Sequence, residues 1–172
     1  MRVLVEKVFP ENEEALSFES WTQVKLKSGL RIELYNQEGS DLRDYIGEKV
    51  DCLIYLSLGS FILGNNEDDG YIFKFNKGKF KVEKVNIEIF TRHLNKESEY
   101  KEIKGIYKGK YSIPEKYLKF KSDIDLEMNY TIENPDGMFL IPPIEKYIEI
   151  QQEVEVSLYV DQFYLIAWLP IE

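Results

Sequence analysis

The feature that most constrains the fold is a regular apolar alternation within residues 47–58. The even positions from 50 to 58 are all apolar, namely Val50, Cys52, Ile54, Leu56 and Leu58. Its odd positions begin polar and become mixed. Successive side chains of a strand point to opposite faces, so this pattern predicts a strand with one face on a hydrophobic core. The same pattern recurs at residues 153–160.

The composition favours strands throughout the chain. Twelve Tyr and ten Phe supply rings that pack well on a pleated surface, and only Ala15 and Ala167 represent the best helix former. We therefore expect a mostly β protein, an antiparallel barrel or sandwich with one or two short helices. With 172 residues the chain can form a single compact unit over residues 1–172. The alternative is an OB-like barrel at 1–85 followed by a second β module at 100–172.

The order of expected elements over residues 2–85 is strand, hairpin, short helix, strand, strand. This order resembles that of a five-stranded OB-type barrel. The likeness is one of fold only, since no sequence family is recognised. The short helix is expected at residues 40–47, where Ser40 or Asp41 can cap its first turn and Gly47 can end it.

Hairpin registers follow from the apolar pattern. A three-residue loop at residues 27–29 sets Val24 opposite Ile32 and keeps the apolar residues on one face, whereas a shift of one residue mixes the faces. Gly29 then takes the left-handed position of the loop. Three further hairpins are predicted, with facing pairs Phe75 and Phe80, Ile132 and Phe139, and Val160 and Phe163.

Charge is distributed unevenly along the chain. Residues 74–121 hold 14 Lys/Arg and 6 Asp/Glu, a balance of 14 − 6 = +8. The remaining residues hold 22 − 14 = 8 Lys/Arg and 31 − 6 = 25 Asp/Glu, a balance of −17, and the two sum to the net charge of −9. Such asymmetry suits electrostatic docking of a partner or of a second copy.

No motif indicates catalysis. His93 is the single histidine, which excludes a site with several histidines, and no glycine-rich phosphate loop is present. A pair of carboxylates acting on a small molecule or glycan stays open, because spacing cannot show convergence. We expect a protein without enzymatic activity and without a cofactor.

A metal site is not expected either. Residues 65–70 resemble the start of a calcium loop, but its twelfth position is Asn76 in place of the bidentate Glu. Cys52, the single cysteine, lies on the apolar face of its predicted strand, where a buried apolar role is expected. The N-terminus shows no secretory pattern, and the charge-free run at 52–66 is too short for a membrane helix. A cytoplasmic location without a membrane partner is expected.

Two binding functions fit these features. The leading hypothesis is a non-enzymatic protein that docks a protein partner, or another copy, through charged surfaces. The alternative is an OB-like module for single-stranded nucleic acid, in which lysines contact phosphates and aromatic rings stack on bases. Its candidate residues are Lys101, Lys104, Tyr107, Lys108, Lys110 and Tyr111. A purely structural reading, in which the rings face the core and the lysines are their solvated neighbours, explains the same pattern.

Overall fold

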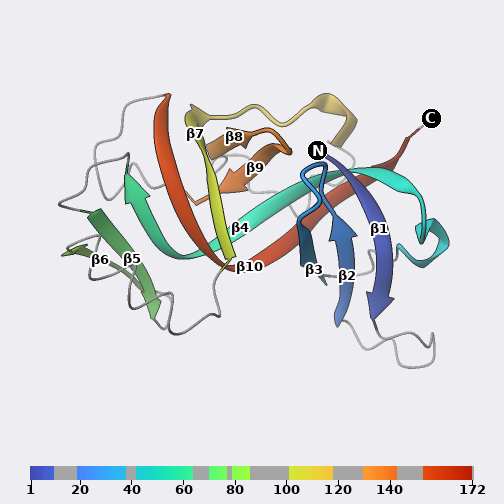
Figure 1. The fold of residues 1–172 in the computed structure, drawn as a ribbon, viewed down its shortest axis with the longest axis horizontal. Coiled ribbons are helices and arrows are strands. Elements are labelled where there is room, and N and C mark those ends of the chain that lie inside the picture. Colours follow the sequence, from blue (N-terminus) through green and yellow to red (C-terminus); the bar gives the residue numbers. More distant parts are fainter. Residues whose placement is uncertain are drawn as a thin grey trace.

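The computed structural model describes residues 1–9, 19–37, 42–63, 70–76, 79–85, 101–117, 130–142 and 153–171. Figure 1 shows the arrangement of their strands. The strands are β1 (Arg2–Phe9), β2 (Glu19–Lys25), β3 (Arg31–Gln37), β4 (Lys49–Leu63), β5 (Gly70–Asn76), β6 (Lys79–Val85), β7 (Lys101–Lys110), β8 (Tyr130–Asn134), β9 (Gly137–Ile141) and β10 (Val154–Pro170). The mostly β, barrel-forming fold class expected from the sequence is confirmed.

Five strands form a closed barrel. β1 pairs with β2, β2 with β3, β3 in parallel with β10, β10 with β4, and β4 again with β1. The first four strands follow one another in the chain, and the fifth comes from its C-terminal end. Closure leaves this barrel without a free sheet edge.

β4 and β10 pair with each other beyond the barrel. Figure 1 shows both as long curved strands that cross the whole molecule. Past the barrel, β10 pairs with β7, β7 with β8, and β8 with β9. β9 meets β4 again through the single residue pair Tyr55 and Leu140. β5 and β6 form a separate two-stranded sheet at one end.

The local hairpins have the registers that the apolar pattern predicts. Val24 faces Ile32 and Gly29 has a φ of 91°, as expected for its loop. Likewise Phe75 faces Phe80. Ile132 faces Phe139 across a turn at which the amide N–H of Asp136 donates to Asn134 Oδ1 at 2.9 Å. Each of these pairings is local in sequence, so the pattern alone determines it.

The predicted hairpin between Val160 and Phe163 is wrong. Residues 154–170 form one strand with a register shift between Val160 and Gln162. The shift adds one residue, so inward positions change from even (Val156, Leu158, Val160) to odd (Phe163, Leu165) while the strand continues. A tight turn between two strands would change the parity of the apolar residues in the same way, so the sequence pattern alone indicated a hairpin.

Two further expectations need correction. The fifth barrel strand is β10, whereas the order read over 2–85 assigned this place to residues 71–75, which lie in β5. In place of a regular helix at 40–47, the described residues contain a 3-10 turn at Arg43–Tyr45, with Gly47 at a φ of 88°. Only the positive φ of Gly47 is as expected.

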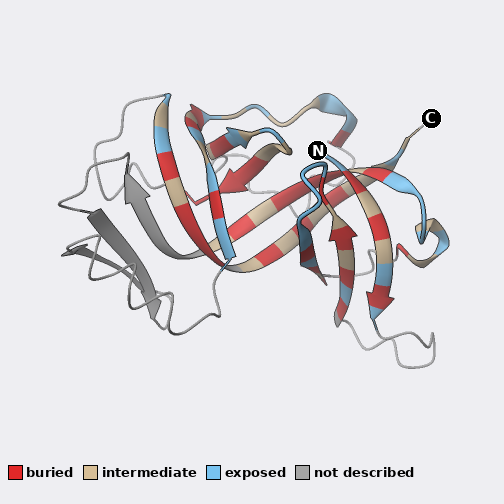
Figure 2. Ribbon diagram, in the orientation of Figure 1, coloured by how far each residue is buried: buried red, intermediate tan, exposed pale blue. Residues whose placement is uncertain are grey.

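The main core fills the barrel and continues between β4, β10 and β7. Figure 2 shows buried and more exposed residues alternating along β1, β2 and β3. Inward side chains include Val5, Ile32, Ile54, Phe139 and Leu158. Cys52 belongs to this core as expected and has no exposed surface. At about 25 cal/mol per Å² of apolar area, burial of such side chains is the dominant stabilising contribution.

A second, smaller core lies on the outer side of β4 and β10. Leu53, Leu140 and Ala167 pack there with Tyr117. Tyr117 belongs to residues 111–117, which pass over these strands after β7. The Lys116 ammonium lies 3.4 Å from a carboxylate oxygen of Asp51 and 5.1 Å from the centre of the Tyr117 ring. This segment therefore covers part of the outer face of β4 and β10.

Gly105→Ala tests the close packing of β7 on β8. A Cβ at this position would lie 2.7 Å from the backbone carbonyl oxygen of Glu133, so the two strands would have to separate. We expect a loss of about 1–3 kcal/mol in the free energy of unfolding, measured by urea denaturation. Lys104→Ala, one residue away and exposed, is the control and should change stability by less than about 0.5 kcal/mol. Equal stability of Gly105→Ala and the native protein would contradict this packing.

Candidate aromatic binding face

The lysines predicted to contact a ligand lie mainly on the outer side of β7. Lys101, Lys104 and Lys110 are exposed, and the Lys108 side chain is one-third exposed. Lys104 and Lys108 alternate with the inward Ile103 and Tyr107, as expected for a strand, whereas Lys101 has the parity of Ile103 and is exposed at the start of β7.

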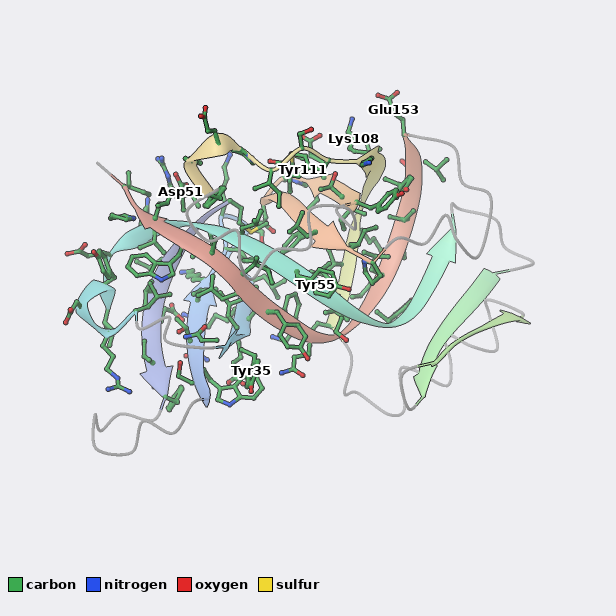
Figure 3. The ribbon with its side chains drawn as sticks, turned by 180° about the vertical axis from the view of Figure 1, so that it is seen from behind. Tyr35, Asp51, Tyr55, Lys108, Tyr111 and Glu153 are labelled. Atoms are coloured by element: carbon green, nitrogen blue, oxygen red, sulfur yellow. The ribbon has the colours of Figure 1, made fainter. Side chains whose placement is uncertain are left out.

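Carboxylates lie among these lysines. The Lys108 ammonium is 3.7 Å from Glu133 and 3.7 Å from Glu153, and Lys104 is 3.7 Å from Glu102. Figure 3 shows Lys108 beside Glu153, well away from Tyr35. Glu155 pairs with Ile106 across β10 and β7. Along β7 the four lysines Lys101, Lys104, Lys108 and Lys110 are thus matched by the four glutamates Glu102, Glu133, Glu153 and Glu155 on β7 and its neighbours, a balance of 4 − 4 = 0.

The two candidate tyrosines are not free surface rings. Tyr107 has no exposed surface and belongs to the main core, so a ligand on the surface does not reach it. Tyr111 packs against the second core, and its partial burial raises the pKa of its hydroxyl. The structure therefore places Lys104 and Lys108 on the outer side of β7 and Lys101 and Lys110 at its two ends, and neither candidate tyrosine offers an open ring beside them.

A different set of aromatic residues forms a row across the outside of the barrel. Phe9 faces Trp21 across β1 and β2, and Trp21 faces Tyr35 across β2 and β3. Tyr35 faces Tyr164 on β10, which faces Tyr55 on β4. We call these five side chains the aromatic row. With about 4.8 Å between strands, its four steps span about 19 Å.

Ring contacts fix the geometry of the row. The ring centroids of Trp21 and Tyr35 are 4.9 Å apart at 64°, and those of Tyr35 and Tyr164 are 5.6 Å apart at 87°. Tyr55 and Tyr164 are 6.3 Å apart and tilted by 58°. The first two are edge-to-face contacts, which stabilise an aromatic pair by about 0.5–1.5 kcal/mol beyond the buried area. These four rings are therefore held in place before any ligand binds.

A buried polar cluster supports the middle of the row from inside. Asn36 Nδ2 donates to Ser20 Oγ at 3.0 Å and to Thr22 Oγ1 at 2.9 Å. Ser20 and Thr22 flank Trp21 on β2, and Asn36 follows Tyr35 on β3, all three pointing inward. Because buried hydrogen bonds are costly to break, this cluster locks β2 against β3 directly behind the rings.

Exposure decreases along the row. Phe9 is 36% and Trp21 37% exposed, whereas Tyr35, Tyr164 and Tyr55 are half-buried. Burial, with a smaller contribution from Tyr164, raises the pKa of the Tyr55 hydroxyl to about 12. Tyr55 also packs against the second core under residues 111–117. The accessible end of the row is therefore formed by β1, β2 and β3.

Cations and hydrogen-bonding groups lie beside this accessible end. On the same outer face, Lys25 pairs with Arg31, and Gln23 lies between Lys7 and Glu33. Arg31 Nε lies 2.8 Å from Glu6 Oε2, and this bond raises the pKa of the guanidinium. We call Lys7, Lys25 and Arg31 the cationic flank. Sequence reasoning missed this face, although the predicted register of Val24 against Ile32 already sets Trp21 beside Tyr35.

The described residues offer no metal site or membrane helix. No three His, Cys, Asp or Glu side chains among them are grouped so that they could hold a metal ion. Within the same residues, no helix has the length and apolar character needed to cross a membrane. His93 and residues 65–69 of the calcium-like loop lie outside the described part of the chain.

Comparisons with known proteins found no relative. The chain matches no protein-family model, no curated protein and no solved structure.

Cys52 gives a direct test of the core that supports the aromatic row. Burial is the main cause that raises the pKa of its thiol from 9.0 to about 12, so the reactive thiolate is absent near neutral pH. We expect no reaction of the native protein with a thiol reagent at pH 8 and one equivalent of reaction in 6 M urea, since Cys52 is the only cysteine. The buried neutral thiol also stabilises the fold below pH 9, a contribution lost as pH rises toward 12. Rapid labelling of the native protein would contradict the burial.

Proposed function

We propose that this protein is a non-enzymatic binding module whose ligand surface is the aromatic row. The observation that supports this most is that the rings of the row lie in register on five adjacent strands and face outward from a barrel that already has a complete core. Aromatic side chains that remain in contact with water lose the benefit of burial, so a continuous row of them indicates a surface that becomes covered.

The residue types of the row fit binding. Trp and Tyr are enriched among residues that contribute most to binding, because a large rigid ring loses little conformational entropy when it is covered. Edge-to-face contacts and the cluster around Asn36 hold these rings in place, which further reduces the entropy lost on binding.

The barrel order supports an OB-type assignment. The pairing order β1, β2, β3, β10, β4 and back to β1 joins five strands in a closed barrel with one parallel pair. In OB-type barrels the face of the second and third strands binds oligonucleotides and oligosaccharides. Trp21 and Tyr35 lie on the corresponding strands here.

Docking of a protein through charged surfaces has weaker support. The net charge of −9 favours a basic partner, but the lysines on β7 are balanced by neighbouring glutamates. Exposed ion pairs of this kind contribute about 0–1 kcal/mol and leave little net potential for a partner. The aromatic row is therefore the better candidate surface. A homo-oligomer and a cytoplasmic location stay predictions from the sequence.

Parallel capture with matched variants tests the proposal. Native protein, the double variant Trp21→Ala with Tyr35→Ala, and the control Lys104→Ala with Lys108→Ala are immobilised and exposed to native lysate. Bound protein and bound nucleic acid are then quantified separately, and each captured component is purified and its affinity remeasured. We expect the row variant to lose at least about tenfold in affinity, as for removal of residues central to binding. The control should retain it.

Two results would contradict the proposal. One is equal binding by the native protein and the row variant. The other is a loss confined to the control, which would identify the outer side of β7 as the binding surface. Thermal unfolding of each variant establishes that lost binding does not come from lost folding.

A further inference from the structure

We infer that the exposed end of the aromatic row and the cationic flank together bind single-stranded nucleic acid. This inference rests on the proposed function and names its ligand. The surface consists of Phe9, Trp21 and Tyr35 as rings, Gln23 and Glu33 as hydrogen-bonding groups, and Lys7, Lys25 and Arg31 as cations. Its location differs from the lysines of β7 that the sequence indicated.

The outer face of β1, β2 and β3 is organised in successive rows. The first row consists of Phe9, Trp21 and Tyr35. The second row lies two residues farther along each strand and consists of Lys7, Gln23 and Glu33. Lys25 and Arg31 follow after two more residues. Each step of two residues is about 7 Å along a strand. Rings, hydrogen-bonding groups and cations thus succeed one another at the spacing of side chains on one sheet face.

These three kinds of group match the parts of an unpaired nucleotide. A base stacks on an aromatic face, its edge accepts and donates hydrogen bonds, and its phosphate contacts a cation. The amide of Gln23 supplies both a donor and an acceptor, and the carboxylate of Glu33 supplies an acceptor. A duplex keeps its bases stacked inside, so this surface selects a single strand.

The local sign of charge favours nucleic acid over a protein partner. An acidic chain of net charge −9 would dock a basic protein on an acidic surface. Yet the rings lie among Lys7, Lys25 and Arg31, opposed only by Glu6 and Glu33 among the described side chains of this face, a balance of 3 − 2 = +1. The exposed end of the aromatic row therefore has a small excess of cations among its described side chains, in a protein whose net charge is −9.

The small cation excess determines the expected binding behaviour. Stacking supplies most of the affinity, and three cations give a slope of log K against log salt concentration of about −2, from about −0.7 per phosphate on a single strand. The three exposed strands span two strand spacings, about 10 Å, so the footprint is about two or three bases. We expect a dissociation constant in the range of about 1–100 μM at low salt.

The test uses fluorescein-labelled oligothymidylate of ten nucleotides and a duplex of the same length. Fluorescence anisotropy is measured from 20 to 200 mM KCl. The single strand should bind with the shallow slope given above, and the duplex should bind at least tenfold more weakly. No binding of the single strand at 20 mM KCl would overturn the inference.

Variants separate the two candidate surfaces. Phe9→Ala and Trp21→Ala should each weaken binding by about tenfold, as expected for loss of one base–aromatic stack. Lys7→Gln and Lys25→Gln should each make the salt slope shallower by about 0.7. The matched controls Lys104→Gln and Lys108→Gln on β7 should change neither quantity. Because Lys7 is exposed and Lys25 half-buried, their variants keep the inference testable where loss of an aromatic ring affects folding.

Each remaining outcome decides between the proposals. A loss of affinity with Lys104→Gln equal to that with Lys25→Gln would overturn the inference in favour of the lysines on β7. Absence of oligonucleotide binding together with row-dependent binding of a purified protein would overturn the nucleic-acid ligand and leave the binding-module proposal standing. If the protein binds neither the oligonucleotide nor a partner that depends on the aromatic row, both the inference and the proposed function are contradicted.

Discussion

The pairing of β4 with β10 is the interaction on which the rest of the structure depends. These two strands come from opposite halves of the chain and pair from Val156 and Leu63 at one end to Pro170 and Val50 at the other. Their pairing closes the barrel, carries β7 and β9, and separates the main core from the second core. It also places Tyr164 beside Tyr55 and so completes the aromatic row.

One consequence is that the two sides of the β4–β10 ribbon have different roles. Its inner side contributes Ile54, Leu56 and Leu165 to the main core. Its outer side is covered by residues 111–117 near Asp51 and bears the half-buried tyrosines of the row farther along. The covering segment leaves the β1–β3 end of the row as the accessible surface. Fold and candidate site therefore follow from the same strand pairing.

Local features of this architecture were predictable from the sequence. Alternation and turn residues determine the facing of Val24 on Ile32 and of Ile132 on Phe139, because a shift of one residue would expose the core. The continuation of β10 past Val160 could not be predicted from the sequence, since a bulge and a hairpin both reverse the parity of apolar residues. Pairing between distant strands leaves no local pattern, so Tyr164 and Tyr55 could not be assigned to the row.

The two tryptophans provide the most direct test of the central claim, that the outer face of β1–β3 binds the ligand. Trp21 lies in the row, whereas Trp168 packs edge-to-face on Tyr45 at 4.8 Å, near the far end of β10. Their indole N–H signals are followed by ¹H–¹⁵N NMR during titration with unlabelled oligothymidylate. The account predicts a progressive, saturable shift of the Trp21 signal while that of Trp168 stays in place. Saturable binding that leaves the Trp21 signal unchanged would contradict it.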